Sequence, residues 1–152
     1  MCCVTTHHVI PQTSLRQHDP PDTPLVMIVD DNADSRDIYS TYFGHKGVRT
    51  VTASNGDDAL TVARAVRPDV VVMDLTMPGT DGWQATRALK AEPATRDVIV
   101  IALTGHAFRG TEKTARDAGC DAYLIKPCLP DQLLDTVLAM WTTRREPRRE
   151  SA

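Results

Sequence analysis

Five polar side chains end or follow apolar, β-rich runs of the sequence, and their chemical types suit phosphate chemistry. They are the carboxylates of Asp30, Asp31 and Asp74, the hydroxyl of Thr104 and the ammonium of Lys126. Three carboxylates that lie close together repel one another and raise each other's proton affinity unless a cation joins them. Oxygen-only ligands around an open site suit Mg²⁺, which keeps several waters and bridges readily to phosphate. These residue types therefore predict a Mg²⁺-dependent phosphate site, provided that the fold brings them together.

Asp74 is the candidate nucleophile of such a site. It ends the run "VVVMD", and burying a carboxylate at the end of a core strand is costly unless its charge is compensated. A carboxylate held beside a metal ion can attack phosphorus and form an aspartyl phosphate. The Lys126 ammonium would hold an anionic oxygen as a point charge, and the Thr104 hydroxyl can donate to one more oxygen. In-line transfer depends mainly on positioning and charge neutralisation, which this set supplies.

The elements that must position these residues alternate in type. Apolar runs typical of strands cover 25–29, 48–53, 69–74, 98–104 and 122–125. Segments with helical spacing separate them, with apolar faces at Ala59, Val62, Ala63 and Val66 and at Leu134, Val137, Leu138 and Trp141. Alternation of this kind predicts an α/β fold, a doubly wound (βα)₅ parallel sheet covered on both faces. Ligand sites of such sheets lie at the carboxyl ends of the strands, where all five polar side chains are expected.

Residue types at the helix ends agree with this division. Asn55 or Ser54 can cap the second helix, and Gly47 and Gly119 follow the first and fourth helices as C-terminal stops. The fourth helix, expected at 109–118, is nearly all polar and has only two alanines as apolar anchors. Little buried area holds it, so we expect it to belong to the less stable part of the domain.

Length and composition bound the class of protein. The 152 residues suit one domain with a proper core, and 41% are apolar and 24% charged. A formal net charge of −3 gives no electrostatic footprint for nucleic acid. No apolar run is long enough for a membrane span, and the N-terminus lacks the features of a signal peptide. Two of the four cysteines are adjacent, a poor disulfide framework, so a cytoplasmic location is expected.

The domain boundaries follow from shifts in composition. Residues 1–23 are rich in proline and polar residues, which predicts a disordered tail. Residues 24–142 are the expected folded domain, and 143–152 are expected to be a flexible, Arg-rich tail. The cysteines and histidines among the first eight residues could bind a metal, although a tail rarely preorganises a site.

Four motifs, in order and each at a strand end, carry a resemblance to a known family. "IVDDN", "VVVMDLTMPGTDG", "ALTGH" and "YLIKP" resemble those of the receiver domain of bacterial two-component response regulators, of the CheY type. The resemblance covers residues 25 to about 142. It implies a flavodoxin-like sheet with the strand order 2-1-3-4-5.

The resemblance also implies roles for individual residues. Asp74 matches the phospho-accepting aspartate, Asp31 matches the direct Mg²⁺ ligand, and Asp30 matches the carboxylate that usually acts through a water. The backbone carbonyl of Thr76 matches the third protein ligand of the metal. Lys126 matches the lysine that contacts the phosphoryl group and precedes a cis proline.

A switch is implied in the same way. Thr104 and Tyr123 match the pair in which the hydroxyl moves to bond the phosphoryl group and the aromatic ring turns inward. The fourth helix, the fifth strand and the fifth helix are then expected to form the face that changes on phosphorylation. Gly105 leaves the phosphoryl group accessible in similar proteins, and His106 could tune how water reaches it.

Each of these residues also has a purely structural interpretation. Asp74 could be a loop or helix-capping aspartate, and the pair Asp30-Asp31 could cap the first helix. Tyr123 could simply pack in the core, and His106 could be an exposed loop histidine. The occurrence of the carboxylates together with Lys126 favours the functional interpretation of Asp74.

Two other classes of protein remain as alternatives. A phosphatase of the haloacid-dehalogenase type also uses an aspartyl nucleophile and Mg²⁺, but its nucleophile follows the first strand in a D-x-D arrangement. Here the candidate nucleophile follows the third strand. A flavodoxin-like cofactor binder would need a Ser/Thr/Gly-rich loop where this chain has "DDNADSRD". Turnover of a small phosphomonoester, or the spectrum of a bound flavin, would favour one of these.

The expected function is therefore that of a single-domain response regulator rather than an enzyme. A sensor histidine kinase or a histidine phosphotransfer protein would donate the phosphoryl group, and phosphorylation would alter the affinity for a downstream effector protein. The sequence predicts no nucleic-acid binding and no membrane insertion. It leaves open whether the protein is a monomer or dimerises on phosphorylation.

Overall fold

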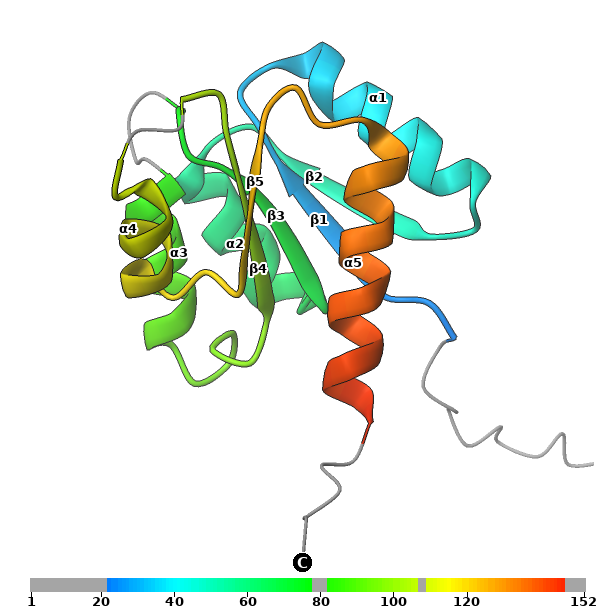
Figure 1. Cartoon of the computed structure of the whole chain (residues 1–152). Helices are drawn as coiled ribbons and strands as arrows, with labels where there is room; N and C mark the ends of the chain where they lie inside the picture. Colours follow the sequence, from blue (N-terminus) through cyan, green and yellow to red (C-terminus); the bar gives the residue numbers. More distant parts are fainter. Residues whose placement is uncertain (1–21, 78–81, 107–108, 147–152) are drawn as a thin grey trace, which may run out of the picture.

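The chain alternates strand and helix five times between Leu25 and Arg145 (Figure 1). The computed structural model describes residues 22–77, 82–106 and 109–146. The strands are β1 (Leu25–Val29), β2 (Arg49–Ala53), β3 (Val70–Asp74), β4 (Ile99–Thr104) and β5 (Ala122–Ile125). The helices are α1 (Ala33–His45), α2 (Gly56–Val66), α3 (Gly82–Ala91), α4 (Thr111–Ala118) and α5 (Pro130–Arg145).

The five strands form one parallel sheet in the order β2-β1-β3-β4-β5, which confirms the predicted fold and strand order. The register aligns the carboxyl ends of neighbouring strands: Val29 pairs with Met73, and Asp74 pairs with Leu103. The direction in which strands are added to the sheet reverses after β2, because β2 lies on one side of β1 and the later strands lie on the other. The switch point is thus at the carboxyl ends of β1 and β3, as the doubly wound topology requires.

Two helical layers cover the sheet, with α1 and α5 on one face and α2, α3 and α4 on the other (Figure 1). The alternation of side chains along each strand divides the core between the layers. On the first face Phe43 of α1 and Leu133 of α5 pack against Ile28 and Ile101. β3 and β4 are buried along their whole length, which explains their continuous apolar runs.

Most predicted helix ends are confirmed. The side chain of Asn55 caps α2 and accepts a hydrogen bond from the backbone amide of Asp58 at 2.8 Å. Gly47 and Gly119 adopt positive φ angles of 78° and 101° where α1 and α4 end. Of the residues that the helical spacing placed on one apolar face, Val66 lies at the last position of α2 and is 41% exposed.

The last helix extends beyond the predicted domain boundary at residue 142 and ends at Arg145. Arg144 donates hydrogen bonds to the backbone carbonyl of Asp97 and to the carboxylate of Asp121, and these contacts hold the last turn against the body of the domain. Arg145 lies over the ring of Trp141, 4.4 Å from its centroid. Most of the two predicted tails lies outside the described residues, which include only 22–23 of the first tail and 143–146 of the second. The possible Cys/His metal site also lies outside them.

Within the described ranges, no helix has both the length and the apolar character that crossing a membrane requires.

Candidate functional site

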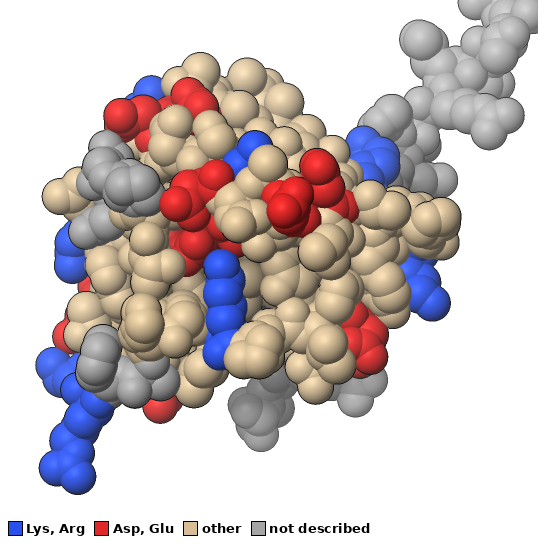
Figure 2. All heavy atoms as spheres, turned by 90° about the horizontal axis from the view of Figure 1, so that it is seen from above, with Lys and Arg blue, Asp and Glu red and all other residues tan. Residues whose placement is uncertain are grey.

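The carboxyl edge of the sheet carries a cluster of acidic side chains with a basic side chain among them (Figure 2). Asp30 and Asp31 follow β1 and Asp74 ends β3, the two strands at the switch point. Each of these three aspartates offers a carboxylate oxygen, and the three oxygens lie within 4.8 Å of one another. The structure therefore brings together the three carboxylates that the sequence predicted. Three oxygens at this spacing, on an open edge, fit a hard cation such as Mg²⁺.

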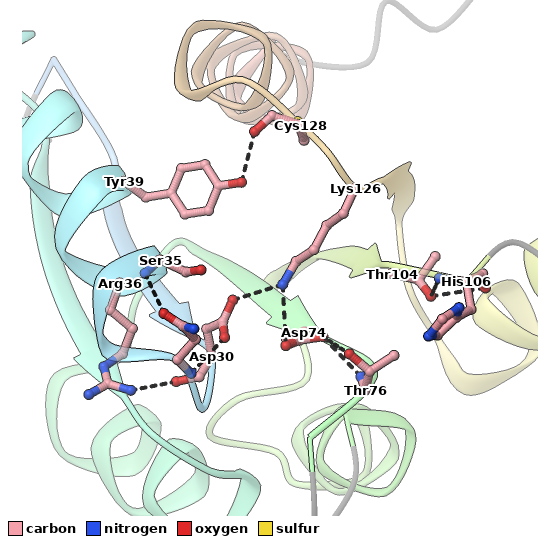
Figure 3. Close-up of polar contacts among 11 residues, drawn as sticks. Asp30, Ser35, Arg36, Tyr39, Asp74, Thr76, Thr104, His106, Lys126 and Cys128 are labelled. Atoms are coloured by element: carbon pink, nitrogen blue, oxygen red, sulfur yellow. Dashed lines mark hydrogen bonds and ion pairs between the residues drawn. The ribbon is translucent and has the colours of Figure 1, made fainter.

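Lys126 joins two of these carboxylates. Its Nζ lies 2.9 Å from Oδ2 of Asp30 and 3.3 Å from Oδ2 of Asp74 (Figure 3). Burial alone would lower the pKa of Lys126, but the hydrogen bond to Asp30 and the charges of Asp74 and Asp30 outweigh it and hold the pKa above its ordinary value. The side chain thus stays an ammonium at neutral pH. It compensates the charge of Asp74 and Asp30, which are each only 2% exposed.

Asp74 is held from its other side by Thr76. The backbone amide and the hydroxyl of Thr76 both donate to Oδ1 of Asp74, at 2.9 and 2.8 Å. Oδ2 faces Lys126, so each carboxylate oxygen has a defined partner and the side chain is oriented before any ligand arrives. The structural alternative for Asp74, a cap for the following helix, has no support in its described hydrogen bonds, which go to Thr76 and Lys126.

The loop after β1 orients Asp30. Its Oδ1 accepts the backbone amide of Asn32 at 2.9 Å, and its backbone carbonyl accepts Nη1 of Arg36 at 2.7 Å. The N-cap of α1 is Asn32, whose side chain accepts the amide of Ser35 at 3.0 Å. The alternative that Asp30 or Asp31 caps this helix is therefore wrong. Asp31 is exposed, which leaves its carboxylate open to a ligand.

Thr104 ends β4 at the same edge, but its hydroxyl is engaged elsewhere. Oγ1 donates to the backbone carbonyl of His106 at 3.1 Å and accepts the His106 amide at 3.2 Å. Figure 3 shows the two residues together, set apart from the Asp74 carboxylate. Thr104 is 3% exposed, whereas Gly105 and His106 are exposed at the rim. A hydroxyl in this state would have to break its local contacts to reach a group on Asp74.

Tyr123 lies in β5, one residue from the strand's start, and packs against the core on the face of the sheet that carries α2, α3 and α4. Its hydroxyl is buried without a hydrogen-bond partner among the described residues. A shallow cleft between α4 and β5 borders the ring, with Ala115, Arg116 and Cys120 in its wall. An unpaired buried hydroxyl costs free energy, so this side chain is poised to gain from a change of position.

Two features of the site were not predicted from the sequence. Tyr39 and Arg36 of α1 donate hydrogen bonds to backbone carbonyls of the loops that carry Lys126 and Asp30. These contacts join distant segments and follow no local pattern. Gly82 begins α3 against the backbone of Asp74, and a Cβ atom there would lie 3.0 Å from the Asp74 carbonyl carbon and 2.9 Å from Cα of Leu75. A glycine in a turn-rich motif is a signal for close approach, but the sequence does not show what it approaches.

The peptide bond between Lys126 and Pro127 is cis, as the resemblance implied.

Comparisons with known proteins agree with this geometry. The family model described as "Response regulator receiver domain" matches residues 26–138. The polar-differentiation response regulator DivK of Brucella anthropi is 36% identical over 112 residues, which cover 74% of this chain and 91% of that protein.

Solved structures of receivers are also similar. The chemotaxis protein CheY4 of Vibrio cholerae superposes with a TM-score of 0.73 at 26% identity, covering 77% of this chain and 98% of that one. The receiver domain of the sensor histidine kinase PA1611 from Pseudomonas aeruginosa PAO1 has a TM-score of 0.70 at 30% identity, covering 80% and 98%. That structure has a magnesium ion coordinated in its active-site cleft.

The family match covers all of the sheet except its first residue and most of the helices, and the motifs of the chain fall on residues that the fold gathers at one edge. The protein is thus a signalling protein rather than a classical enzyme, and it belongs to the family of response regulator receiver domains of two-component systems.

Proposed function

We propose that Asp74 accepts a phosphoryl group in a Mg²⁺-dependent reaction, and that this modification switches the affinity of the domain for a partner protein. The observation that carries the proposal is the arrangement at the switch point of the sheet. Three carboxylates converge there within 4.8 Å, and the Lys126 ammonium contacts two of them. An ammonium between two carboxylates would be sufficient for a structural ion pair, but a third, exposed carboxylate adds to the charge rather than balancing it. The excess of negative charge supports a cation site.

The residues would divide the chemistry among themselves. Asp31, Asp30, Asp74 and the backbone carbonyl of Thr76 would hold Mg²⁺, with Asp30 acting through a water. The bound ion neutralises charge that develops on the phosphoryl oxygens. An oxygen of Asp74 attacks phosphorus as the donor's N–P bond breaks, and the donor imidazole leaves with the electron pair and takes a proton from solvent. Lys126 moves from the Asp74 carboxylate to an oxygen of the transferred group.

The same residues would set the lifetime of the signal. The exposed backbone of Gly105 leaves the rim open to solvent, and the exposed His106 lies next to Thr104. Water that reaches the phosphorus would hydrolyse the aspartyl phosphate slowly. This catalysis of its own phosphorylation and dephosphorylation is the only reaction that we assign to the chain.

The switch would involve Thr104 and Tyr123. Thr104 exchanges its contact with the His106 backbone for one with the phosphoryl group, and Tyr123 moves into the space that opens. The neighbouring α4 is held by little buried surface, since Ala115 and Ala118 are its buried residues. The face formed by α4, β5 and α5 would therefore change first. Amide exchange over residues 109–125 that is identical with and without a phosphoryl mimic would contradict this part of the proposal.

The partners follow from the family and from the surface. A sensor histidine kinase or a histidine phosphotransfer protein would donate the phosphoryl group, and an effector protein would read the switched face. Two exposed apolar side chains, Ile38 on α1 and Leu129 after Lys126, are 57% and 58% exposed and offer a protein donor apolar contact beside the rim.

Cys120 and Cys128 are free thiols, which is consistent with a cytoplasmic location. We propose that the protein binds no nucleic acid and does not insert into a membrane. It would act as a monomer or as a phosphorylation-dependent dimer.

The test is phosphorylation by a small acyl phosphate. The wild-type protein, incubated with Mg²⁺ and acetyl phosphate, should gain one phosphoryl group by intact mass, and Asp74→Asn should gain none. Chelation of Mg²⁺ should abolish the gain in the wild type, because the carboxylates would then repel the incoming anion.

Asp69→Asn is the matched control. Asp69 immediately precedes β3, at the opposite end of the strand that Asp74 ends, and its carboxylate accepts the amide of Leu25 at 2.8 Å. The control variant should be phosphorylated like the wild type. Equal labelling of Asp74→Asn and the wild type would overturn the assignment of Asp74.

A further inference from the structure

Tyr39 has no role in the chemistry described above, yet it is built in beside it. The residue lies in α1 with 8% of its surface exposed, and its ring packs in the core that α1 and α5 share. Its hydroxyl donates a hydrogen bond of 2.8 Å to the backbone carbonyl of Cys128, 89 positions along the chain. Figure 3 shows the ring pointing across the gap between α1 and the loop that precedes α5. A buried phenol with a single defined acceptor fixes the distance between the two segments.

The acceptor belongs to the loop that carries Lys126. Lys126 leaves β5 with its backbone amide bonded to the carbonyl of Thr104 at 2.7 Å, and Cys128 follows two residues later. Among the described residues, the hydrogen bond from Tyr39 is the one that joins this loop to α1. Without it, the Cys128 carbonyl would turn to water and the loop would have more freedom at the residue that must place an ammonium.

The same helix also holds the other half of the ion pair. Arg36 donates to the backbone carbonyl of Asp30 at 2.7 Å, and residues three apart on a helix are neighbours on its surface. Arg36 and Tyr39 therefore fix the loops of Asp30 and Lys126 to adjacent points of α1. Nζ of Lys126 lies 2.9 Å from Asp30 and 3.3 Å from Asp74, between the two carboxylates.

We propose that Tyr39 is a positioning residue for Lys126: its hydroxyl ties the loop of residues 126–129 to α1 and so holds the ammonium where the phosphoryl oxygens arrive. The inference rests on the proposed role of Asp74 as the phosphoacceptor. Tyr39 touches neither the carboxylates nor the incoming group, so it acts only through the backbone of the loop.

Two properties of Tyr39 suit this role. The pKa of Tyr39 is raised above its ordinary value, mainly by burial and also by the neighbouring Cys128. The hydroxyl therefore keeps the proton that it donates. The ring alone would satisfy the core, as Phe43 does one turn further along the same helix. The hydroxyl therefore adds a function that packing does not require.

The test compares Tyr39→Phe with Tyr42→Phe. Both changes remove one phenol oxygen from α1, but the Tyr42 hydroxyl has no hydrogen-bond partner among the described residues. The rate of phosphorylation by acetyl phosphate should fall about 3–10-fold in Tyr39→Phe, because misplacement of a reacting group by a fraction of an ångström is costly. It should remain at the wild-type value in Tyr42→Phe. The dissociation constant for Mg²⁺, measured by calorimetry, should change by less than about twofold in either variant, since Lys126 is not a metal ligand.

The route through Lys126 is tested in a double-mutant cycle. In a Lys126→Met background, Tyr39→Phe should change the remaining rate by less than about 1.5-fold, because the group that it positions is gone. The inference is overturned by a wild-type rate in Tyr39→Phe, by equal slowing in the Lys126→Met background, or by a parallel loss of Mg²⁺ affinity, which would indicate general loosening of the site.

Failure of the proposed function itself has a different signature. If the wild type gains no phosphoryl group at all, Asp74 is not the acceptor. Hydrogen exchange then decides whether the anchor exists. Faster exchange confined to the segment 126–129 in Tyr39→Phe supports the anchor, and unchanged exchange there overturns it.

Discussion

Gly82→Ala should damage both stability and phosphorylation, because Gly82 lies against the backbone of the phosphoacceptor. A Cβ atom at this position would lie 2.9 Å from Cα of Leu75 and 3.0 Å from the carbonyl carbon of Asp74, with the carbonyl oxygen closer still. Two carbon atoms attract most at about 3.5–4.0 Å. The added methyl group therefore requires the start of α3 or the end of β3 to move by about 0.5–1 Å.

The end of β3 resists such a movement. Asp74 pairs with Leu103 of β4, and the amide of Leu75 donates to the Leu103 carbonyl at 2.9 Å. Overpacking a well-packed site costs about 1–3 kcal/mol, which exceeds the gain of about 0.5–1 kcal/mol that alanine has over glycine within a helix. We expect a net loss of about 1–2 kcal/mol in the free energy of unfolding. Because the Asp74 carboxylate moves with its backbone, the rate of phosphorylation by acetyl phosphate should fall about 10–100-fold.

Gly44→Ala makes the same chemical change where nothing opposes it. Gly44 lies near the end of α1, and a Cβ atom there would meet nothing within 4 Å beyond its chain neighbours and the backbone of its own helix. This variant should be more stable than the wild type by about 0.5 kcal/mol and should be phosphorylated at the wild-type rate. Urea denaturation measures the stabilities. A Gly82→Ala protein that unfolds at the wild-type urea concentration and is phosphorylated at the wild-type rate would refute the reasoning.

Two further predictions concern Lys126 and the surface beside it. Burial alone would lower the pKa of Lys126, but Asp30 and Asp74 raise it above the ordinary value. The stabilising contribution of the charged lysine is therefore fully present below about pH 10.4, and it is lost only as the pH rises through the raised pKa. Without Mg²⁺, the difference in unfolding free energy between the wild type and Lys126→Met should stay constant from about pH 7 to about pH 9 and shrink above about pH 10.4. A difference that changes near neutral pH would contradict the ion pair. Ile38→Asp should slow transfer from a phosphohistidine protein by about fivefold or more while the rate with acetyl phosphate is unchanged, because only a protein donor must cover this exposed side chain. Equal slowing with both donors would contradict docking at α1.

The strand ends could be predicted from the sequence because the patterns that define them are local. Runs such as "VVVMD" show burial on both faces, and the helical spacing between them leaves a parallel sheet as the arrangement that buries every apolar face. In a parallel sheet all carboxyl ends lie at one edge, so Asp30, Asp74 and Lys126 were expected along that edge. The strand order that the family resemblance implied then placed the first strand beside the third. The four motifs, in their order along the chain, are enough to indicate the family.

Local pattern could not predict what each side chain contacts at that edge. The sequence placed Thr104 and Tyr123 at the right strands, but the structure shows Thr104 bonded to the His106 backbone and the Tyr123 hydroxyl buried without a described partner. It suggested Asp30 or Asp31 as a helix cap, whereas the cap is Asn32. Such choices depend on the φ and ψ angles of a few loop residues, and several residues of one loop can satisfy the same pattern.

Tertiary structure alone decided the contacts that set the geometry of the site. Tyr39 meets Cys128 across 89 residues, Gly82 lies against Asp74, and Arg144 keeps α5 helical beyond the predicted boundary by bonding to Asp97 and Asp121. These contacts join segments with no shared periodicity, so only packing brings them together. The sequence by itself determined which groups are available at the carboxyl edge, because parallel strands end at the same edge. The distances among those groups, with Lys126 between Asp30 and Asp74, depend on contacts between distant segments that only the tertiary structure shows.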